Sequence, residues 1–240
     1  MAEPSSDTPP ETGPRLPRSS TVNHTTTPVV VIVPGLGDHG ASHWQNRLAA
    51  TLSRSRTVRR PPGDARLNRD AWVTALESTL REISHPVVLV AHSAGVLTTV
   101  HWAQQPTRDI HAALLVTPPD FETPLPDGYP STDQLTTLGW NPIPRRQLPF
   151  PSILAASSND PLAARRRVAG LAETWGSRLI DVGPVGHLDP AAGYGPWPQA
   201  EQLLHDLTAT ADIQPPEDRL REARPPKKST SRTGLCRSHR

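Results

Sequence analysis

The sequence predicts an α/β fold: about six mostly parallel strands with helices on both faces of the sheet, in three layers. Apolar runs typical of strands alternate six times with segments whose apolar residues recur every three or four positions. The run at 87–90 has four aliphatic residues without a polar break, as in strands buried on both faces of a parallel sheet. A chain of 240 residues can hold one such domain between two tails.

Ordered structure is expected from residue 28 to residue 210. Residues 1–27 are rich in Pro, Ser and Thr, and residues 211–240 are rich in Pro and Arg, so we expect both tails to be disordered. The C-terminal tail has eight Lys and Arg against four Asp and Glu, an excess larger than the net charge of +2 of the whole chain. The basic charge therefore belongs to the tail, and the small net charge does not favour a nucleic acid partner.

In the first half of the domain, strands and helices are predicted in turn. The aliphatic run at 29–33 indicates a buried strand, and apolar residues at i+4 spacing predict a helix at 43–53. A short strand at 57–60, nearer the sheet edge, stops at two prolines. The next helix has Asn68 as its N-cap and an apolar stripe that ends at Ile83.

The second half continues the alternation. The strand at 87–91 turns sharply into a helix that reaches about Gln104, and another apolar strand is expected at 110–116. Proline is tolerated in the first turn of a helix, which favours a helix that starts at Pro161. The remaining expected elements are strands at 152–156 and 178–182 and helices at 161–175 and 197–210.

Residues 117–149 interrupt this pattern. They contain eight prolines and few periodic apolar residues, together with the aromatic residues Phe121, Tyr129 and Trp140. A long irregular insertion within a domain is usually either disordered or functional. Because it follows a central strand, we expect this insertion to form a lid or a pocket wall, with Phe121 lining the pocket.

A serine lies between the strand at 87–91 and the helix that follows it. Residues 91–95 read Ala-His-Ser-Ala-Gly, close to the G-x-S-x-G nucleophile elbow, with Ala91 in place of the first glycine. Such a turn exposes the hydroxyl above the sheet and directs a helix N-terminus at developing negative charge. Ser93 is therefore the predicted nucleophile, although a buried strand followed by an ordinary serine N-cap would read similarly.

An activated serine needs a base and a group that orients the base. Asp160 and His187 each follow a predicted strand, on a loop with Gly, Ser or Pro, and with Ser93 they give the chain order serine, acid, histidine. All three are expected at the carboxyl edge of the sheet, where ligands of such folds bind. Taken alone, Asp160 would also serve as a helix N-cap. Asp120, just after the strand at 110–116, remains a rival for the acid.

Backbone donors for an oxyanion are predicted at two positions. Ala94 follows the nucleophile, and Leu36 lies in the loop after the first strand. That loop lacks the glycine pattern of a phosphate site, and the histidines lack paired ligand spacing, so we expect neither cofactor nor metal. His92 should pack or shape the pocket, with its side chain directed away from the Ser93 hydroxyl.

Four segments resemble the short serine hydrolases related to retinoblastoma-binding protein 9, a compact α/β-hydrolase family. These segments are Pro34-Gly35 with His43-Trp44-Gln45, then residues 91–95, 155–161 and 186–198. The resemblance implies the α/β-hydrolase fold, with Ser93, Asp160 and His187 as nucleophile, acid and base. It also implies that His43 and Trp44 line the pocket mouth, although Trp44 equally fits as the first apolar anchor of its helix.

These observations predict a serine hydrolase of the carboxylesterase type that cleaves small acyl esters, or less readily amides, with perhydrolysis on the same residues left open. The alternative is a non-catalytic binding or regulatory protein on a hydrolase scaffold, whose basic tail attracts acidic partners. No apolar run approaches the length of a membrane span, and the one cysteine, Cys236, leaves no disulfide framework. We therefore expect a cytoplasmic protein without a membrane partner.

Overall fold

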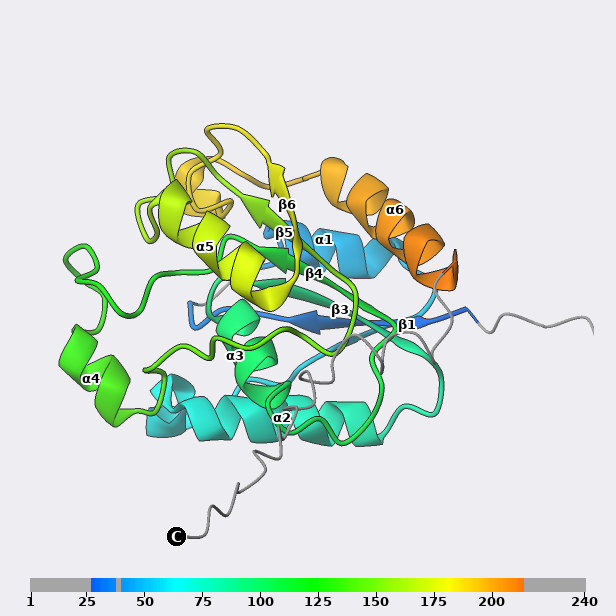
Figure 1. Cartoon of the computed structure of the whole chain (residues 1–240), viewed down its shortest axis with the longest axis horizontal. Coiled ribbons are helices and arrows are strands. Elements are labelled where there is room, and N and C mark those ends of the chain that lie inside the picture. Colours follow the sequence, from blue (N-terminus) through cyan, green and yellow to red (C-terminus); the bar gives the residue numbers. More distant parts are fainter. Residues whose placement is uncertain (1–26, 38–39, 214–240) are drawn as a thin grey trace, which may run out of the picture.

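Six strands form one sheet in the order β2-β1-β3-β4-β5-β6, and every neighbouring pair is parallel (Figure 1). The computed structural model describes residues 27–37 and 40–213. The strands are β1 (Val29–Val33), β2 (Ser55–Thr57), β3 (Val87–His92), β4 (Ala112–Val116), β5 (Ser152–Ala156) and β6 (Arg178–Asp181). The predicted fold class is confirmed.

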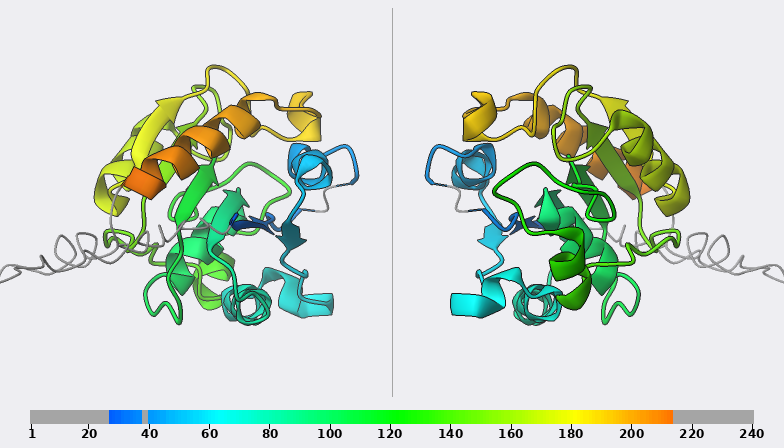
Figure 2. Two further views of the ribbon diagram at one scale, coloured as in Figure 1. Left: turned by 90° about the vertical axis from the view of Figure 1, so that its right-hand side faces the viewer. Right: turned by 90° about the vertical axis from the view of Figure 1, so that its left-hand side faces the viewer.

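Helices cover both faces of this sheet (Figure 2). The helices are α1 (Trp44–Thr51), α2 (Arg69–Arg81), α3 (Ala94–Trp102), α4 (Thr132–Thr137), α5 (Arg165–Trp175) and α6 (Gln199–Ile213), with short 3-10 turns η1 (Gly63–Leu67) and η2 (Pro190–Ala192). Successive strand residues point to opposite faces, so Val30 and Ile32 of β1 pack with α1 and α6. Val31 and Val33 pack with α2, α3 and α5 on the other face.

The strand order reverses direction beside β1. From β1 the chain passes outward to β2, and then returns to place β3 on the other side of β1. The loops after β1 and β3 therefore lead to opposite faces of the sheet, which opens a crevice at their carboxyl ends. This topological switch point is where the predicted nucleophile and the predicted oxyanion loop meet.

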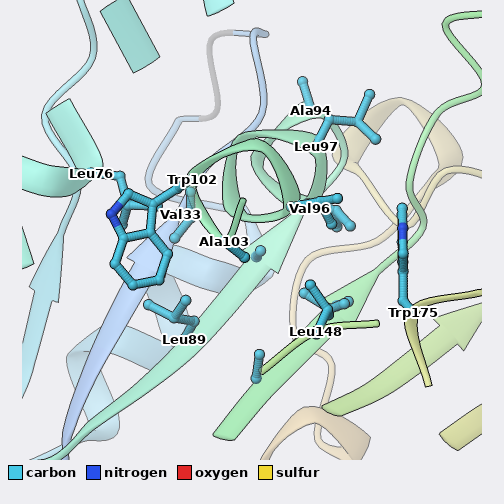
Figure 3. Packing of buried hydrophobic residues seen from close by; sticks show 14 of the residues in the cluster. Val33, Leu76, Leu89, Ala94, Val96, Leu97, Trp102, Ala103, Leu148 and Trp175 are labelled. Carbon is cyan, nitrogen blue, oxygen red and sulfur yellow. The ribbon is translucent and has the colours of Figure 1, made fainter. Parts of the chain in front are cut away.

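Helix α3 is buried on nearly all sides, which fixes the start of the helix relative to the sheet. Figure 3 shows Val96 and Leu97 of α3 over the strands of the sheet, with Leu76 of α2 on one side and Trp175 of α5 on the other. A helix that is apolar all round is stable only within a core. The turn at the N-terminus of α3 is consequently held by packing along the whole helix.

Several elements begin at residues other than those predicted, and β2 and α5 show the reason. Pairing of β2 with β1 runs from the Arg54 carbonyl to the Val58 N–H, so the strand is 55–57 rather than 57–60, and Val58 is its last bonded residue. Helix α5 begins at Arg165 rather than Pro161. The segment before α5 bonds elsewhere, because the Leu162 N–H donates to the Asp160 side chain and the Leu162 carbonyl accepts from the main chain of residue 120.

The insertion at 117–149 contains one helix that the sequence analysis did not predict. Helix α4 begins at a capping box, in which the Ser131 hydroxyl accepts from the Gln134 N–H and the Gln134 side chain accepts from the Ser131 N–H. Ser-x-x-Gln is a known signal for the start of a helix, but the surrounding prolines favoured an irregular segment. Helix α6 also differs, running from 199 to 213 rather than from 197 to 210.

The predicted tails lie almost entirely outside the described residues, which exclude 1–26 and 214–240. Within the described part of the chain, no helix is both long enough and apolar enough to span a lipid bilayer.

Candidate active site

Ser93 occupies the turn between β3 and α3 in a conformation that L residues rarely adopt. Its φ is 57° and its ψ is −131°, and its N–H donates to the Val116 carbonyl at 3.0 Å. A non-glycine residue at positive φ persists only where the surrounding structure enforces it. The packing of α3 and the bond to β4 supply that enforcement.

Gly95, the second small residue of the elbow, cannot be larger. A Cβ atom at this position would lie 2.2 Å from the Val33 carbonyl oxygen and 2.8 Å from that of Pro34. The first turn of α3 therefore approaches the end of β1 more closely than any side chain allows. Ala91, in contrast, pairs regularly with Val33 and Leu115 inside the sheet, so its extra methyl group is accommodated.

Ser93, His187 and Asp160 form a hydrogen-bonded row. His187 Nε2 lies 2.8 Å from Ser93 Oγ, and His187 Nδ1 lies 3.0 and 3.1 Å from the two Asp160 carboxylate oxygens. The side chains of His187 and Asp160 are only 7% and 2% exposed. An ionised carboxylate can only accept, so Nδ1 carries the proton and Nε2 is left to accept the serine proton. This is the tautomer that a general base requires.

The loops that carry the acid and the base are tied together. Asp160 Oδ1 accepts from the Leu162 N–H at 2.9 Å, which orients the carboxylate. Asn159 Oδ1 accepts from the Gly186 N–H at 2.7 Å and from the Ser157 hydroxyl at 3.0 Å. The sequence analysis did not identify Asn159 as a site residue. Its position directly before the acid was the available signal, since Asn is a frequent loop-bonding residue.

A sequence model of the serine hydrolase family matches residues 30–206, about three quarters of the chain, and this range includes Ser93, Asp160 and His187. The chain belongs to the serine hydrolase family.

Solved structures agree with this assignment. A protein of Pectobacterium atrosepticum described as a YdeN-like hydrolase is 31% identical, with a TM-score of 0.63, over 76% of this chain and 91% of its own. The ydeN gene product of Bacillus subtilis is 17% identical, with a TM-score of 0.56, over 78% of this chain and 100% of its own. Est1E of Butyrivibrio proteoclasticus is 13% identical, with a TM-score of 0.59, over 80% of this chain and 91% of its own. The last two likenesses concern the α/β-hydrolase fold alone. No curated protein matches the chain in sequence.

In this serine hydrolase, the rival acid Asp120 is engaged elsewhere. Its carboxylate accepts from Arg167 Nε at 2.7 Å and from a terminal nitrogen of the same guanidinium at 3.0 Å. Burial raises the pKa of Asp120, but the hydrogen bonds and charge of Arg167 outweigh burial and bring the pKa below its ordinary value. The hydrogen bond to His187 Nδ1 is made by Asp160.

The two residues predicted to supply oxyanion donors are Ala94 and Leu36, and their role stays a prediction. Ala94 is the first residue of α3, so its N–H has no partner within the helix. Leu36 is partly buried in the loop after β1 and packs against the core cluster that includes α3. Buried Gln45, which the sequence analysis named only within a family segment, donates to the carbonyls of Val33 and Val90 at 3.3 and 3.0 Å. It thereby connects β1 and β3 near their carboxyl ends.

The four predicted pocket residues, His43, Trp44, His92 and Phe121, are all at most 4% exposed. His43 caps α1, since its Nδ1 accepts from the main chain of residue 45, and Trp44 is the apolar anchor of that helix. Phe121 packs edge-on against Trp140 within the core, at 5.6 Å between ring centroids. These packing contacts account for the burial of the side chains, and a role in lining a substrate pocket stays a prediction.

His92 points away from the nucleophile, and its Nε2 meets the main-chain carbonyl of His187 at 2.9 Å.

Tyr129 of the insertion is about half exposed, and burial, followed by the charges of Asp189 and Asp160, raises its pKa. The insertion also contacts the loop of Asp160, since the Asp120 N–H donates to the Leu162 carbonyl at 2.9 Å. Among the described residues, no group of three or more His, Cys, Asp or Glu is arranged to hold a metal ion.

Proposed function

We propose that this protein is a carboxylesterase-like hydrolase that cleaves small acyl esters, and amides less readily, through an acyl-enzyme. The observation that carries this proposal is the row from Ser93 Oγ through both nitrogens of His187 to the Asp160 carboxylate, with every link within 3.1 Å. The narrower kinship with the relatives of retinoblastoma-binding protein 9, and a cytoplasmic location, form part of the same proposal.

In the first half of the reaction, Ser93 Oγ attacks the ester carbonyl while His187 Nε2 takes the hydroxyl proton. Asp160 stabilises the imidazolium that forms and keeps the ring oriented. The main-chain N–H groups of Ala94 and Leu36 donate to the tetrahedral oxyanion, and the N-terminus of α3 adds its positive dipole. His187 then gives its proton to the leaving alcohol as the C–O bond breaks.

In the second half, water replaces the alcohol. His187 takes a proton from the water as its oxygen attacks the acyl carbon, and the same donors hold the second oxyanion. Collapse of this intermediate returns the proton to Ser93 Oγ and releases the carboxylic acid. Halide displacement on this fold is disfavoured, because that chemistry needs a carboxylate where this chain has Ser93.

The test is labelling with a fluorophosphonate probe, run alongside turnover of p-nitrophenyl acetate and butyrate. We expect the wild type to label and to turn over, and Ser93→Ala to lose labelling and about four to six orders of magnitude in kcat. Ser78→Ala, at an exposed serine of α2, is the matched control and should behave as the wild type. A folded wild type that neither labels nor turns over would refute the proposal and favour a binding or regulatory protein.

A further inference from the structure

We propose that His92 is a positioning residue for the base, acting through the main chain of His187; this inference rests on the proposed function. His92 is fully buried, and its Nε2 lies 2.9 Å from the His187 carbonyl oxygen, 95 residues away in the chain. A carbonyl oxygen can only accept, so Nε2 carries the proton and donates. The bond therefore fixes the tautomer of His92 as well as the position of the His187 backbone.

The place of His92 in the chain gives this bond its effect. His92 is the last residue of β3 and directly precedes Ser93. The same short segment therefore carries the nucleophile and binds the loop of the base. Ser93 and His187 are thus joined twice, by their side chains at 2.8 Å and by the His92 imidazole at 2.9 Å. A shift of the base loop relative to β3 would lengthen both contacts together.

A second donor reaches the same carbonyl oxygen from the neighbouring strand. Thr117 follows β4, and its hydroxyl donates to the His187 carbonyl at 3.4 Å while its own N–H donates to the Ala155 carbonyl at 3.0 Å. The φ of Thr117 is 44°, which is an outlier for a β-branched residue. Leu188, just after the base, has a φ of 53°. Strained backbone thus lies on both sides of the clamped carbonyl.

Aromatic packing keeps the His92 ring in place. Its centroid lies 4.9 Å from that of His43, 5.8 Å from that of Trp44 in an edge-on arrangement, and 5.1 Å from that of His187. Trp44 in turn packs edge-on against Trp197 at 5.0 Å. The ring is therefore enclosed between α1 and the base, which leaves it little freedom to release the carbonyl.

Loss of this bond should affect the chemical step rather than substrate binding. The catalytic ring of His187 must lie within a fraction of an ångström of its working position, and displacement by about 1 Å costs on the order of a hundredfold in rate. A group that acts only through the base changes kcat with little change in KM. If His92 acted by packing alone, replacements of similar size would have the same effect on kcat whether or not they could donate a hydrogen bond.

The experiment compares His92→Leu, which fills the space without a donor, with His92→Gln, whose amide can still donate. His101→Leu is the matched control, because His101 Nε2, in the last turn of α3, makes the same kind of bond to a main-chain carbonyl, that of Trp140, at 3.1 Å. Thr117→Val removes the second donor with little change in shape. For each variant, kcat and KM for p-nitrophenyl acetate and the rate of fluorophosphonate labelling are measured together with Tm.

We expect His92→Leu to lower kcat and the labelling rate by roughly ten- to a hundredfold with KM little changed, and His92→Gln to retain most of the wild-type kcat. Thr117→Val should show a smaller loss of the same kind, which tests the clamp even if His92→Leu fails to fold. A wild-type kcat in His92→Leu, equal losses in the Leu and Gln variants, or an equal loss in His101→Leu would overturn the inference. An inactive wild type would instead remove the proposed function, and the inference with it.

Discussion

Asp160 and Asp120 are two carboxylates at the same edge of the sheet with different partners. Asp160 bonds to His187 Nδ1 and to the main chain of its own loop, whereas Asp120 is bound in two places by Arg167. A positively charged partner satisfies a carboxylate permanently, while a neutral imidazole leaves it free to stabilise a charge that develops during the reaction. We therefore expect Asp160 to act in catalysis and Asp120 to act in stability.

Replacement of each carboxylate by its amide separates these tasks. Asp160→Asn should lower kcat for p-nitrophenyl acetate by about 10⁴-fold, because the amide favours the wrong tautomer of the base. Asp120→Asn, the matched control, should leave kcat near the wild-type value and lower the free energy of unfolding by about 1–2 kcal/mol, since Arg167 is partly exposed. If Asp120→Asn loses as much activity as Asp160→Asn, the assignment of the acid is wrong.

At the scale of the elements, the elbow depends on the contact between the start of α3 and the end of β1. The conformation of Ser93 is unfavourable by about 1–3 kcal/mol on its own, and the buried α3 compensates for it. The close approach at Gly95 sets the height of the helix above the sheet. The Ser93 hydroxyl and the Ala94 N–H therefore keep one position relative to the loop after β1.

Two glycine substitutions in helices test this contact. Gly95→Ala would force its Cβ against main-chain carbonyls that cannot move aside, so we expect a loss of at least about 2 kcal/mol in the free energy of unfolding, together with lower kcat. Gly170→Ala, in α5, meets no atom within 4 Å and should stabilise the protein by about 0.5–1 kcal/mol with kcat unchanged. Urea unfolding and esterase assays check both, and similar stability in the two variants would contradict the close approach.

At the scale of the whole molecule, the insertion at 117–149 is fastened to the domain by charge. Arg167 of α5 binds both Asp120 and Glu122, and Glu122 also binds Arg145 and accepts from the Ile143 N–H at 2.9 Å. The insertion thus connects to α5 near its start, and near its end the Trp175 indole N–H of α5 donates to the Pro144 carbonyl at 2.9 Å. An isolated surface pair contributes little, but a buried carboxylate in a network of this kind contributes more.

This network predicts how stability depends on pH. The pKa of Asp120 is lowered in the folded protein, so the stabilisation is complete above the unfolded carboxyl pKa of about 3.9 and is lost as pH falls through the lower folded value. The difference in free energy of unfolding between wild type and Asp120→Asn should therefore be constant from about pH 7 to pH 5 and should close below about pH 4. Urea unfolding across this range measures the difference; a gap that persists at the acid end would show that the charge of Asp120 is not its source.

Local patterns were sufficient to predict much of this protein. The strand runs and the sharp turn at Ser93 follow from residues within a few positions of one another. Buried strands, turns and helix caps are determined largely by neighbouring side chains, so the sequence carries them directly. Boundaries were less well predicted where the main chain bonds to distant segments, as before α5 and at β2.

Only the tertiary structure decided between partners that are distant in sequence. Asp120 and Asp160 both follow parallel strands, and the choice between them depends on Arg167, which lies 47 residues from Asp120. The bonds from Asn159 to Gly186 and from His92 to His187 likewise span 27 and 95 residues. Such contacts depend on the path of each loop and on which donor the fold brings closest to each acceptor. The residues adjacent in sequence determine neither the path nor the choice of donor.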